Sequence, residues 1–351
     1  MKAWEDKIRR VVPYTPGEQP KRPVIKLNTN ECPYPPSPSV EQAMRALDAD
    51  TLRLYPDTEA LPLVKALSAA YGVEEDQIFV GVGSDDVLAM AFMTFFQGEK
   101  PILFPDITYS FYDVWAELFR IPYEKVPLDG TFHIGKEDYY RENGGVIFPN
   151  PNAPTAIAED LDFIRDILRH NQDVIVIVDE AYIDFSEKPS AKELLDEFEN
   201  LLVVQTFSKS RAMAGMRIGY AFGSRELIKA MKDIKYSFNS YTMNLPSQMA
   251  GAAAAADQDY LKHTVQKVVA TRERTQKRLA ELGFSFPKSE ANFVFASHKT
   301  KPAREIYEAL KKKDIYVRYF DKPRIYNYLR ITIGTDAQMD QLFDALEKIL
   351  R

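Results

Sequence analysis

Short apolar runs alternate with stretches of helical periodicity through the first two-thirds of the chain. Residues 174–178 are an unbroken run of valine and isoleucine, which is typical of a central strand buried on both faces. Residues 61–71 carry apolar positions at helical spacing and end at Gly72, a common helix terminator. The strands predicted in this way are residues 78–82, 102–104, 123–126, 145–148, 174–178, 201–204 and 218–222. Their alternation with helices predicts an α/β fold, a mostly parallel seven-stranded sheet flanked by helices.

Two regions depart from this pattern. The first 38 residues contain eight prolines and predict an extended arm that lies on its own domain or on a partner subunit. Near residue 245 a long helix begins, with Pro246 in its first turn and Thr242 or Asn244 as its cap. Short strands and helices follow, at residues 292–296, 303–312, 315–318, 329–333 and 336–349. We therefore predict an N-terminal arm (1–38), a large domain (39–245) and a smaller α+β C-terminal domain (246–351).

Composition and charge argue against several classes of function. The net charge of −6 leaves no basic surplus to neutralise nucleic acid phosphates. No apolar run reaches membrane-spanning length, and the first ten residues lack the apolar segment of a signal peptide. The single cysteine, Cys32, cannot form an internal disulfide and fits a reducing cytoplasm. The histidines lack the spacing of metal ligands, so we expect no metal site and place their side chains at the surface or in loops: His133, His170, His263 and His298.

The polar turn after residues 201–204 holds the first candidate for chemistry. Lys209 lies just beyond this predicted strand, where α/β sheets bind ligands, and partial desolvation would make its amine a nucleophile towards carbonyl groups. Thr206, Ser208 and Arg217 offer the donors and the forked cation that a phosphate needs. A phosphate beside a reactive lysine indicates a phosphorylated aldehyde cofactor held as a Schiff base. The alternative is a solvated lysine. A nucleotide-binding P-loop is disfavoured because its glycines are missing.

Further polar residues follow other predicted strands. Asp179 ends the buried run of valines and isoleucines, where a carboxylate needs a cationic partner such as a protonated pyridine nitrogen. Ser84 begins a helix, whose N-terminus favours an anion. Asn152 sits in a proline-bracketed turn that would aim its amide, and Tyr109 could stack on a flat ring. Each residue also has an ordinary structural interpretation, such as helix capping for Ser84 or a surface turn for Tyr109.

Four motifs carry a resemblance to a known family: PNPNAPT, VDEAYIDF, TFSKSRAMAGMRIGY and YLRITIGT. With them, the chain resembles the fold-type I, pyridoxal phosphate-dependent aminotransferases over nearly its whole length. The opening PYTPGE, the asparagine turn LNTNECPYPPSP and the turn YPD are similar to the histidinol-phosphate aminotransferase branch. The resemblance implies pyridoxal 5'-phosphate as the cofactor and a homodimer with shared active sites.

The same resemblance implies a role for each matched residue. Lys209 would bind the cofactor covalently and move the proton between the substrate carbon and the cofactor carbon. Asp179 would hold the pyridine nitrogen, Asn152 and Tyr182 the ring oxygen, and Tyr109 would stack on the ring. The phosphate would be bound by Ser84, Asp85 (through its backbone), Thr206, Ser208 and Arg217, with Tyr55 from the partner subunit. Arg330 would bind the carboxylate of the amino donor. The rest of the substrate pocket would be formed by Tyr14, Asn30 and Arg318.

The chain departs from the family pattern at several positions. Ser210 and Arg211 replace the usual small and aromatic pair after the lysine. Arg211 would add a cation near the cofactor, where it could lower the pKa of the lysine, contact a substrate phosphate or remain solvated. Ala156 stands where the turn often uses glycine, Val82 where asparagine is usual, and Ile107 where proline is common. These departures leave the identity of the substrate open.

The function implied by the resemblance is transamination between histidinol phosphate and 2-oxoglutarate. The products would be imidazole-acetol phosphate and glutamate, in histidine biosynthesis. Two alternatives use the same scaffold: an aromatic amino-acid aminotransferase and a decarboxylase of a phospho-amino acid such as threonine phosphate. An alternative of a different class is a pyridoxal phosphate-binding module without turnover, which the full set of matched positions argues against.

Overall fold

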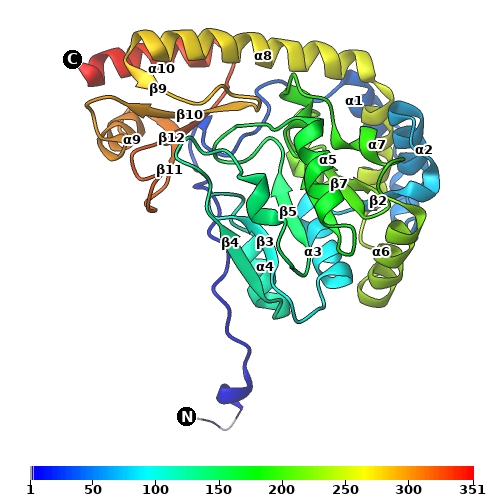
Figure 1. Ribbon diagram of the computed structural model, residues 1–351. Coiled ribbons are helices and arrows are strands. Elements are labelled where there is room, and N and C mark those ends of the chain that lie inside the picture. The colour runs from blue at the N-terminus through cyan, green and yellow to red at the C-terminus, as the bar shows by residue number, and fades with distance from the viewer. Residues whose placement is uncertain (1, 3) are drawn as a thin grey trace.

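A seven-stranded sheet forms the centre of the computed structural model, which describes residue 2 and residues 4–351 (Figure 1). Its strands are β2 (Ile78–Gly81), β3 (Ile102–Pro105), β4 (Tyr123–Val126), β5 (Val146–Pro149), β6 (Val176–Asp179), β7 (Leu201–Thr206) and β8 (Gly219–Phe222). Their order is β2-β8-β7-β6-β5-β3-β4. Strand β8 runs antiparallel to β2 and β7, and the other neighbours are parallel. The predicted α/β fold with a mostly parallel seven-stranded sheet is therefore confirmed.

Helices cover both faces of this sheet, because successive side chains of a strand point to opposite sides. In β6, Val176 and Val178 belong to the core on one face and Ile177 to the core on the other. Side chains of α2, α5 and α7 join the first core, and those of α3, α4 and α6 join the second. The helices are α1 (Pro38–Arg45), α2 (Leu61–Tyr71), α3 (Ser84–Phe95), α4 (Tyr112–Phe119), α5 (Leu161–His170), α6 (Arg225–Phe238) and α7 (Leu245–Ala256). The central strand expected at residues 174–178 is thus buried on both faces.

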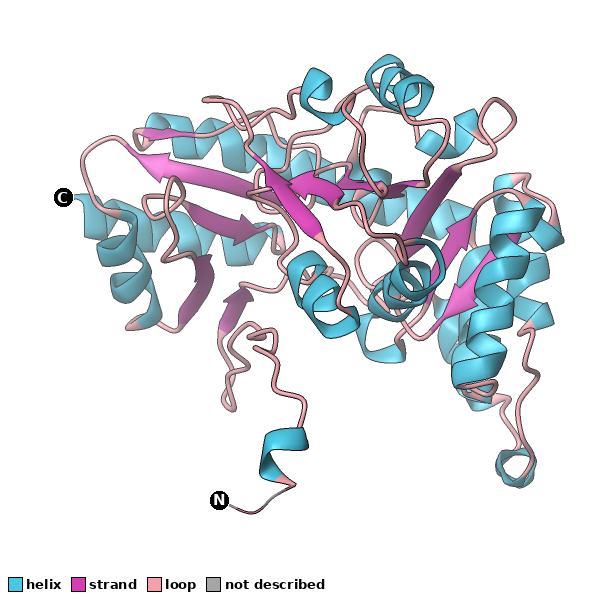
Figure 2. Ribbon diagram, turned by 60° about the horizontal axis from the view of Figure 1, so that its bottom comes forward, coloured by secondary structure: helices cyan, strands magenta, loops and turns pink. Residues whose placement is uncertain are grey.

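A second sheet of five strands is formed mainly by the C-terminal part of the chain (Figure 2). Its strands are β1 (Ile25–Leu27), β9 (Phe284–Ser285), β10 (Phe293–His298), β11 (Ile315–Tyr319) and β12 (Leu329–Thr332), in the order β1-β11-β12-β10-β9. Strand β1 comes from the N-terminal arm and pairs in parallel with β11. The helices of this part are α8 (Gln258–Glu281), α9 (Ala303–Lys311) and α10 (Asp336–Leu350). The arm therefore joins the C-terminal sheet, although the two segments lie far apart in the sequence.

The long helix expected after Pro246 is divided into α7 and α8 at Asp257. The Asp257 carboxylate caps α8 by accepting a hydrogen bond from the backbone N–H of Tyr260 (3.2 Å). Asn244 is the N-cap of α7, as one of the two expected candidates. Helix α7 packs on α1 and α2, and its Ala250 lies in the core of the large sheet. The domain division at residue 245 remains a prediction.

Several local features differ from the sequence expectations. Helix α6 has no counterpart among the predicted helices, although Ser224 caps it and its Met231 is fully buried. Residues 191–194 form the short 3₁₀ helix η6 and residues 195–197 form turns, so the described residues between β6 and β7 form no regular α-helix. His298, expected at the surface or in a loop, is buried at the end of β10, where its Nε2 lies 3.1 Å from the carbonyl oxygen of Leu282. A backbone carbonyl group therefore gives the buried imidazole of His298 a hydrogen-bond partner.

Short 3₁₀ helices form many of the connections. They are η1 (Glu5–Lys7), η2 (Ala49–Arg53), η3 (Glu75–Gln77), η4 (Lys136–Tyr139), η5 (Ile183–Phe185), η6 (Ala191–Leu194) and η7 (Ala214–Met216). Two of them, η5 and η7, follow the strands whose ends carry the candidate site. In the part of the chain that the structure describes, no helix is both long and apolar enough to cross a membrane.

Candidate active site

A cavity of about 160 Å³ opens at the carboxyl ends of β6 and β7, the edge at which parallel sheets bind ligands. The predicted residues that line it are Ser84, Asp85, Tyr109, Asp179, Tyr182, Thr206, Ser208, Lys209 and Arg217. Side chains from five different segments thus meet in one place, because four of the segments follow a strand at this edge and Arg217 lies just before the antiparallel strand β8 there. The cofactor residues proposed from the sequence lie together, apart from Asn152 and Tyr55.

Lys209 lines this cavity and the one beside it. Its Nζ donates a hydrogen bond to the carbonyl oxygen of Thr29 at 3.3 Å and lies 5.8 Å from the centre of the Tyr182 ring. Among the described residues, no carboxylate forms an ion pair with it. An amine held by one carbonyl group and facing a cavity is available to a ligand carbonyl, as a nucleophilic lysine must be.

Asp179 is buried at the end of β6. Its Oδ2 accepts a hydrogen bond from the hydroxyl of Tyr112 (2.7 Å), and its Oδ1 accepts one from the backbone N–H of Ala181 (3.3 Å). Burial raises the pKa of this carboxyl from 3.8 to about 6, because desolvation outweighs both hydrogen bonds. A cation placed in the cavity beside Asp179 would recover much of that cost. The site therefore suits a ring whose nitrogen is protonated.

The other end of the cavity suits a phosphate. Helix α3 begins at Ser84, and the first N–H groups of a helix lack partners within it and attract anions. The Arg217 guanidinium lies against Gly83, whose φ of +88° favours a glycine and whose missing Cβ leaves room for this approach. Thr206 and Ser208 place their hydroxyl groups 3.0 Å apart at the end of β7. Helix dipole, cation and hydroxyl groups converge at this end.

The two acidic residues in the first turn of α3, Asp85 and Asp86, are bound by donors of the protein, which reduces their repulsion of a phosphate. Asp85 accepts a hydrogen bond from the hydroxyl of Tyr109 (2.7 Å) and pairs with Arg217 (3.2 Å). Asp86 turns back and accepts a hydrogen bond from the backbone N–H of Val82 (2.9 Å). Both carboxylates are therefore occupied by donors of the protein, and Asp85 orients Tyr109 at the edge of the cavity.

A second cavity of about 180 Å³ adjoins the first, and Lys209, Thr29, Tyr109, Ala153 and Tyr182 line both. It contains the four residues proposed for the substrate, which are Tyr14, Asn30, Arg318 and Arg330. Arg318 and Arg330 are paired across β11 and β12. Arg330 donates one hydrogen bond to the carbonyl oxygen of Asn28 (2.8 Å), while its buried Nε has no partner among the described residues. Lys209 thus faces both the cavity proposed for the cofactor and the cavity proposed for the substrate.

Two proposed cofactor residues lie outside both cavities. Asn152 is buried and donates to the carbonyl oxygen of Ile107 (2.9 Å) and to the hydroxyl of Thr155 (3.1 Å), so its amide is held rigidly. Tyr55 is 80% exposed and packs against the ring of Tyr241, at 4.4 Å between ring centres. Neither residue touches the cavity within this one chain, and the roles proposed for both remain predictions.

Arg211 is neither solvated nor exposed to the two cavities. It is buried, its Nη1 donates to the carbonyl oxygen of Ala254 and its Nη2 to the hydroxyl of Tyr71 (3.1 Å). Its guanidinium also lies 4.9 Å from the centre of the Phe207 ring. It does not line the cavities at Lys209. Arg211 therefore points into the core beneath the lysine and anchors this loop to α2 and α7.

Several residues at the site escaped the sequence reasoning. Tyr112, which binds Asp179, lies on α4, and only the folded chain shows that its hydroxyl faces the end of β6. Thr29 and Asn28 reach the site from the arm, next to the predicted Asn30. Asn30 donates to the hydroxyl of Tyr182 (2.9 Å). The turn LNTN supplied a signal, but asparagines in turns usually bind their own backbone.

The comparisons with known proteins agree with this geometry. The model of the family "Aminotransferase class I and II" matches residues 22–346. A histidinol-phosphate aminotransferase of Clostridium beijerinckii is 50% identical over 350 residues, covering 99% of this chain and 98% of that protein. One of Brachyspira hyodysenteriae is 49% identical over 347 residues, with the same coverage.

A solved structure gives the same result. The histidinol-phosphate aminotransferase of Sinorhizobium meliloti in complex with pyridoxal-5'-phosphate has a TM-score of 0.84 and 26% identity, covering 94% of this chain and 92% of that one. The predicted cofactor and the predicted enzyme class are confirmed at the level of the family. The cavity, the buried carboxylate, the helix N-terminus and the free lysine fit that cofactor. The chain belongs to the class I and II aminotransferases, which depend on pyridoxal phosphate.

Proposed function

We propose that this aminotransferase interconverts histidinol phosphate and imidazole-acetol phosphate, with glutamate and 2-oxoglutarate as the other pair. The observation that carries the proposal is the pair of arginines in the second cavity. Neither Arg318 nor Arg330 forms an ion pair with a carboxylate among the described residues, and both line the space beside Lys209. Two arginines without counterions suit substrates that carry a phosphate in one half-reaction and carboxylates in the other.

The names of the relatives support the same substrate. Proteins that are about 50% identical to this chain over nearly its full length are called histidinol-phosphate aminotransferases. The tyrosine, asparagine and arginine side chains of the second cavity supply the polar groups that a phosphorylated imidazole needs.

Each site residue then has a defined task. Pyridoxal phosphate, when bound, supplies the electron sink that stabilises a carbanion. Asp179 would hold the protonated ring nitrogen, and Tyr182 with Asn152 would orient the ring at its oxygen. The amine of Lys209 would carry the proton between the substrate carbon and the cofactor carbon, since it lies between the two cavities. Arg330 would fix the substrate carboxylate, so that the reacting carbon faces Lys209.

A substrate panel tests this function. Purified protein loaded with pyridoxal phosphate is mixed with histidinol phosphate, glutamate, phenylalanine and phosphothreonine, and the visible absorbance of the cofactor is followed. Histidinol phosphate and glutamate should bleach the band, and each keto product should restore it. A clear preference for phenylalanine would indicate the aromatic aminotransferase, and carbon dioxide release from phosphothreonine the decarboxylase. An unchanged spectrum with every donor would indicate a binding module without turnover.

Arg330→Lys is expected to raise the KM for glutamate roughly 10- to 100-fold, with a smaller effect on kcat. A lysine keeps the charge but cannot form the two parallel hydrogen bonds that a guanidinium makes to a carboxylate. Steady-state kinetics at varied glutamate concentration measures this change. Arg304→Lys, on the exposed surface of α9, is the control. An unchanged KM for Arg330→Lys would exclude Arg330 as the carboxylate ligand.

We also infer that the enzyme is a homodimer in which Tyr55 completes the site of the partner subunit. Support comes from the exposed apolar side chains around Tyr55, which include Leu52, Leu54 and Tyr241. Such a patch is typical of a protein interface. A cytoplasmic location is inferred from the single cysteine.

Subunit complementation tests the shared site. Lys209→Ala and Tyr55→Ala chains with different tags are co-expressed, and the mixed dimer is purified. One of its two sites then combines an intact Lys209 with an intact Tyr55. About half of the wild-type activity per dimer should return, since a symmetric dimer has two equivalent sites. A mixed dimer no more active than the parent variants would contradict shared sites.

A further inference from the structure

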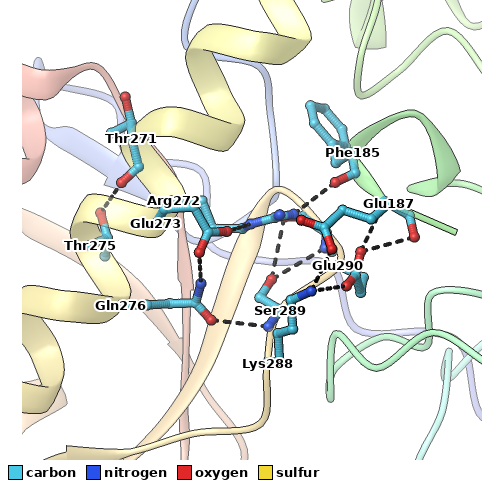
Figure 3. Close-up of polar contacts among 12 residues, drawn as sticks. Phe185, Glu187, Thr271, Arg272, Glu273, Thr275, Gln276, Lys288, Ser289 and Glu290 are labelled. Atoms are coloured by element: carbon cyan, nitrogen blue, oxygen red, sulfur yellow. Dashed lines mark hydrogen bonds and ion pairs between the residues drawn. The ribbon is translucent and has the colours of Figure 1, made fainter.

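Arg272 is the largest of the fully buried side chains in the described residues. It lies in the middle of α8, which carries none of the residues that line the cofactor cavity. Its Nη1 donates to the carbonyl oxygens of Phe185 (2.8 Å) and Ala291 (3.1 Å) (Figure 3). Its Nε pairs with the half-exposed Glu273 (3.0 Å), and its Nη2 has no partner among the described residues. A guanidinium remains charged when buried, so this position must be held by its hydrogen bonds.

The two carbonyl groups belong to segments that both lead to Tyr182. Phe185 ends the 3₁₀ helix η5, and its own N–H donates to the carbonyl oxygen of Tyr182 at 3.0 Å. Ala291 immediately precedes Asn292, whose side chain donates to the carbonyl oxygen of Asn30 at 3.0 Å. Arg272 is therefore the point at which the backbone after Tyr182 meets the strand that begins at Phe293.

These hydrogen bonds, with one from Asn30, form a closed ring of contacts that begins and ends at Tyr182. Asn30 donates from its side chain to the hydroxyl of Tyr182 at 2.9 Å, so Tyr182 is held at its hydroxyl through Asn30 and Asn292. It is held at its backbone through Phe185 and Arg272. Among the described residues, the members of this ring come from the arm, the loop after β6, α8 and the approach to β10. A shift of any one of these segments would move the Tyr182 hydroxyl.

Neighbouring contacts strengthen the same junction. Glu290 accepts hydrogen bonds from the backbone N–H of Glu187 (2.7 Å) and from the hydroxyl of Ser186 (3.1 Å). Gln276 accepts one from the backbone N–H of Ser289 (3.0 Å) (Figure 3). The segment before β10 is thus attached both to α8 and to the loop that follows Tyr182. Arg272 reaches from α8 to backbone carbonyl groups of both the loop after Tyr182 and the segment before β10.

We propose that Arg272 is a positioning residue of the cofactor site, acting through Tyr182. It fixes the distance between the loop after β6 and the start of β10, and so places the Tyr182 hydroxyl where it would contact the bound cofactor. The inference rests on the role proposed for Tyr182. It goes beyond that role because Arg272 lines neither cavity.

A double-mutant cycle tests the proposal with two readouts besides activity. The dissociation constant of pyridoxal phosphate is measured by titrating the apoprotein, and the pH midpoint of the visible cofactor band is measured in each loaded variant. The variants are Arg272→Lys, Tyr182→Phe and the double variant. Arg274→Lys is the matched control, because Arg274 lies on the same helix but pairs with Asp336 and Asp340 at the surface.

Arg272→Lys should weaken cofactor binding about tenfold and shift the pH midpoint, since a lysine cannot reach both carbonyl groups. Tyr182→Phe should do the same, and the double variant should be no worse than Tyr182→Phe alone. Arg274→Lys should match the wild type. Where Arg272→Lys yields too little folded protein, Asn292→Ser opens the same ring from its other side and should show the same coupling to Tyr182→Phe.

The outcomes separate this inference from the proposed function. Additive losses in the double variant, or an unchanged Arg272→Lys protein, would overturn the positioning role while leaving Tyr182 and the transamination intact. A Tyr182→Phe protein with wild-type affinity and an unchanged pH midpoint would overturn both the role of Tyr182 and this inference. In that case, the substrate panel would still decide the reaction.

Discussion

Lys209→Ala is expected to lower transamination at least about a thousandfold, because the variant loses both the amine that binds the cofactor and the group that moves the proton. Alanine leaves the fold intact, since the only hydrogen bond recorded for the Lys209 side chain within the described residues goes to the carbonyl oxygen of Thr29. The single-turnover rate with glutamate, followed by the absorbance of the bound cofactor, measures the loss.

Two controls make this result specific. Lys229→Ala removes a lysine that pairs with Asp233 on the exposed face of α6, and it should keep wild-type activity. Added methylamine should partly restore the Lys209→Ala protein, because a small amine can enter the vacated space and carry the proton. Full activity in Lys209→Ala would exclude this lysine from the reaction and with it the proposed mechanism.

Asp179→Asn is expected to lower kcat at least about a hundredfold. Removing one partner of a buried charge pair costs roughly 3–5 kcal/mol, and here the lost partner is the carboxylate that would keep the cofactor nitrogen protonated. Asparagine keeps the size of the side chain and can still bond the hydroxyl of Tyr112. The loss therefore reports the charge rather than a cavity. Asp162→Asn, on the exposed surface of α5, is the control, and a fully active Asp179→Asn enzyme would contradict the pairing.

The same residue sets a pH dependence of the apoprotein. Burial raises the pKa of Asp179 from 3.8 to about 6, so the folded state holds this proton more tightly than the unfolded state. The contribution of Asp179 to the free energy of unfolding therefore falls as the pH rises between these two pKa values, by at most roughly 3 kcal/mol. Glu180, buried beside it with a pKa raised from 4.5 to about 7, acts in the same direction.

Urea unfolding of the apoprotein across this pH range tests the linkage. Asp179→Asn should be more stable than the wild type above about pH 6 and should lose part of the pH slope, leaving the part due to Glu180. Equal pH slopes for the two apoproteins would show that the folded state does not raise the pKa of Asp179. If Asp179→Asn is more stable but less active than the wild type, the buried Asp179 carboxylate costs the fold stability and is needed for activity.

Much of the fold and half of the site follow from local patterns. The valine and isoleucine run of β6 determines a buried strand, and the residue at its end, Asp179, is then placed at the edge where ligands bind. Lys209 follows β7 in the same way. These features depend on periodicity and on residues next to one another in the chain, so the sequence alone determines them.

Other features depend on contacts that no local pattern describes. The pairing of β1 with β11 joins residues almost 300 positions apart, at Ile25 and Ile315. The hydroxyl of Tyr112 on α4 reaches Asp179 at the end of β6, and Arg211 turns into the core instead of the cofactor cavity. Each of these outcomes is chosen by the packing of several elements at once, because a buried polar group goes where a partner can satisfy it.

The stretch around Lys209 contains both kinds of information. Its own residues determine a strand, a polar turn and an amine at the ligand-binding edge of an α/β sheet, because these follow from the order of apolar and polar positions. The tertiary structure alone decides that Thr29 from the arm meets this amine and that Arg211 faces away from it. It alone also decides that Arg272 of α8 donates a hydrogen bond to the carbonyl oxygen of Phe185, in the loop after Tyr182, since these neighbours come from segments that only folding brings together.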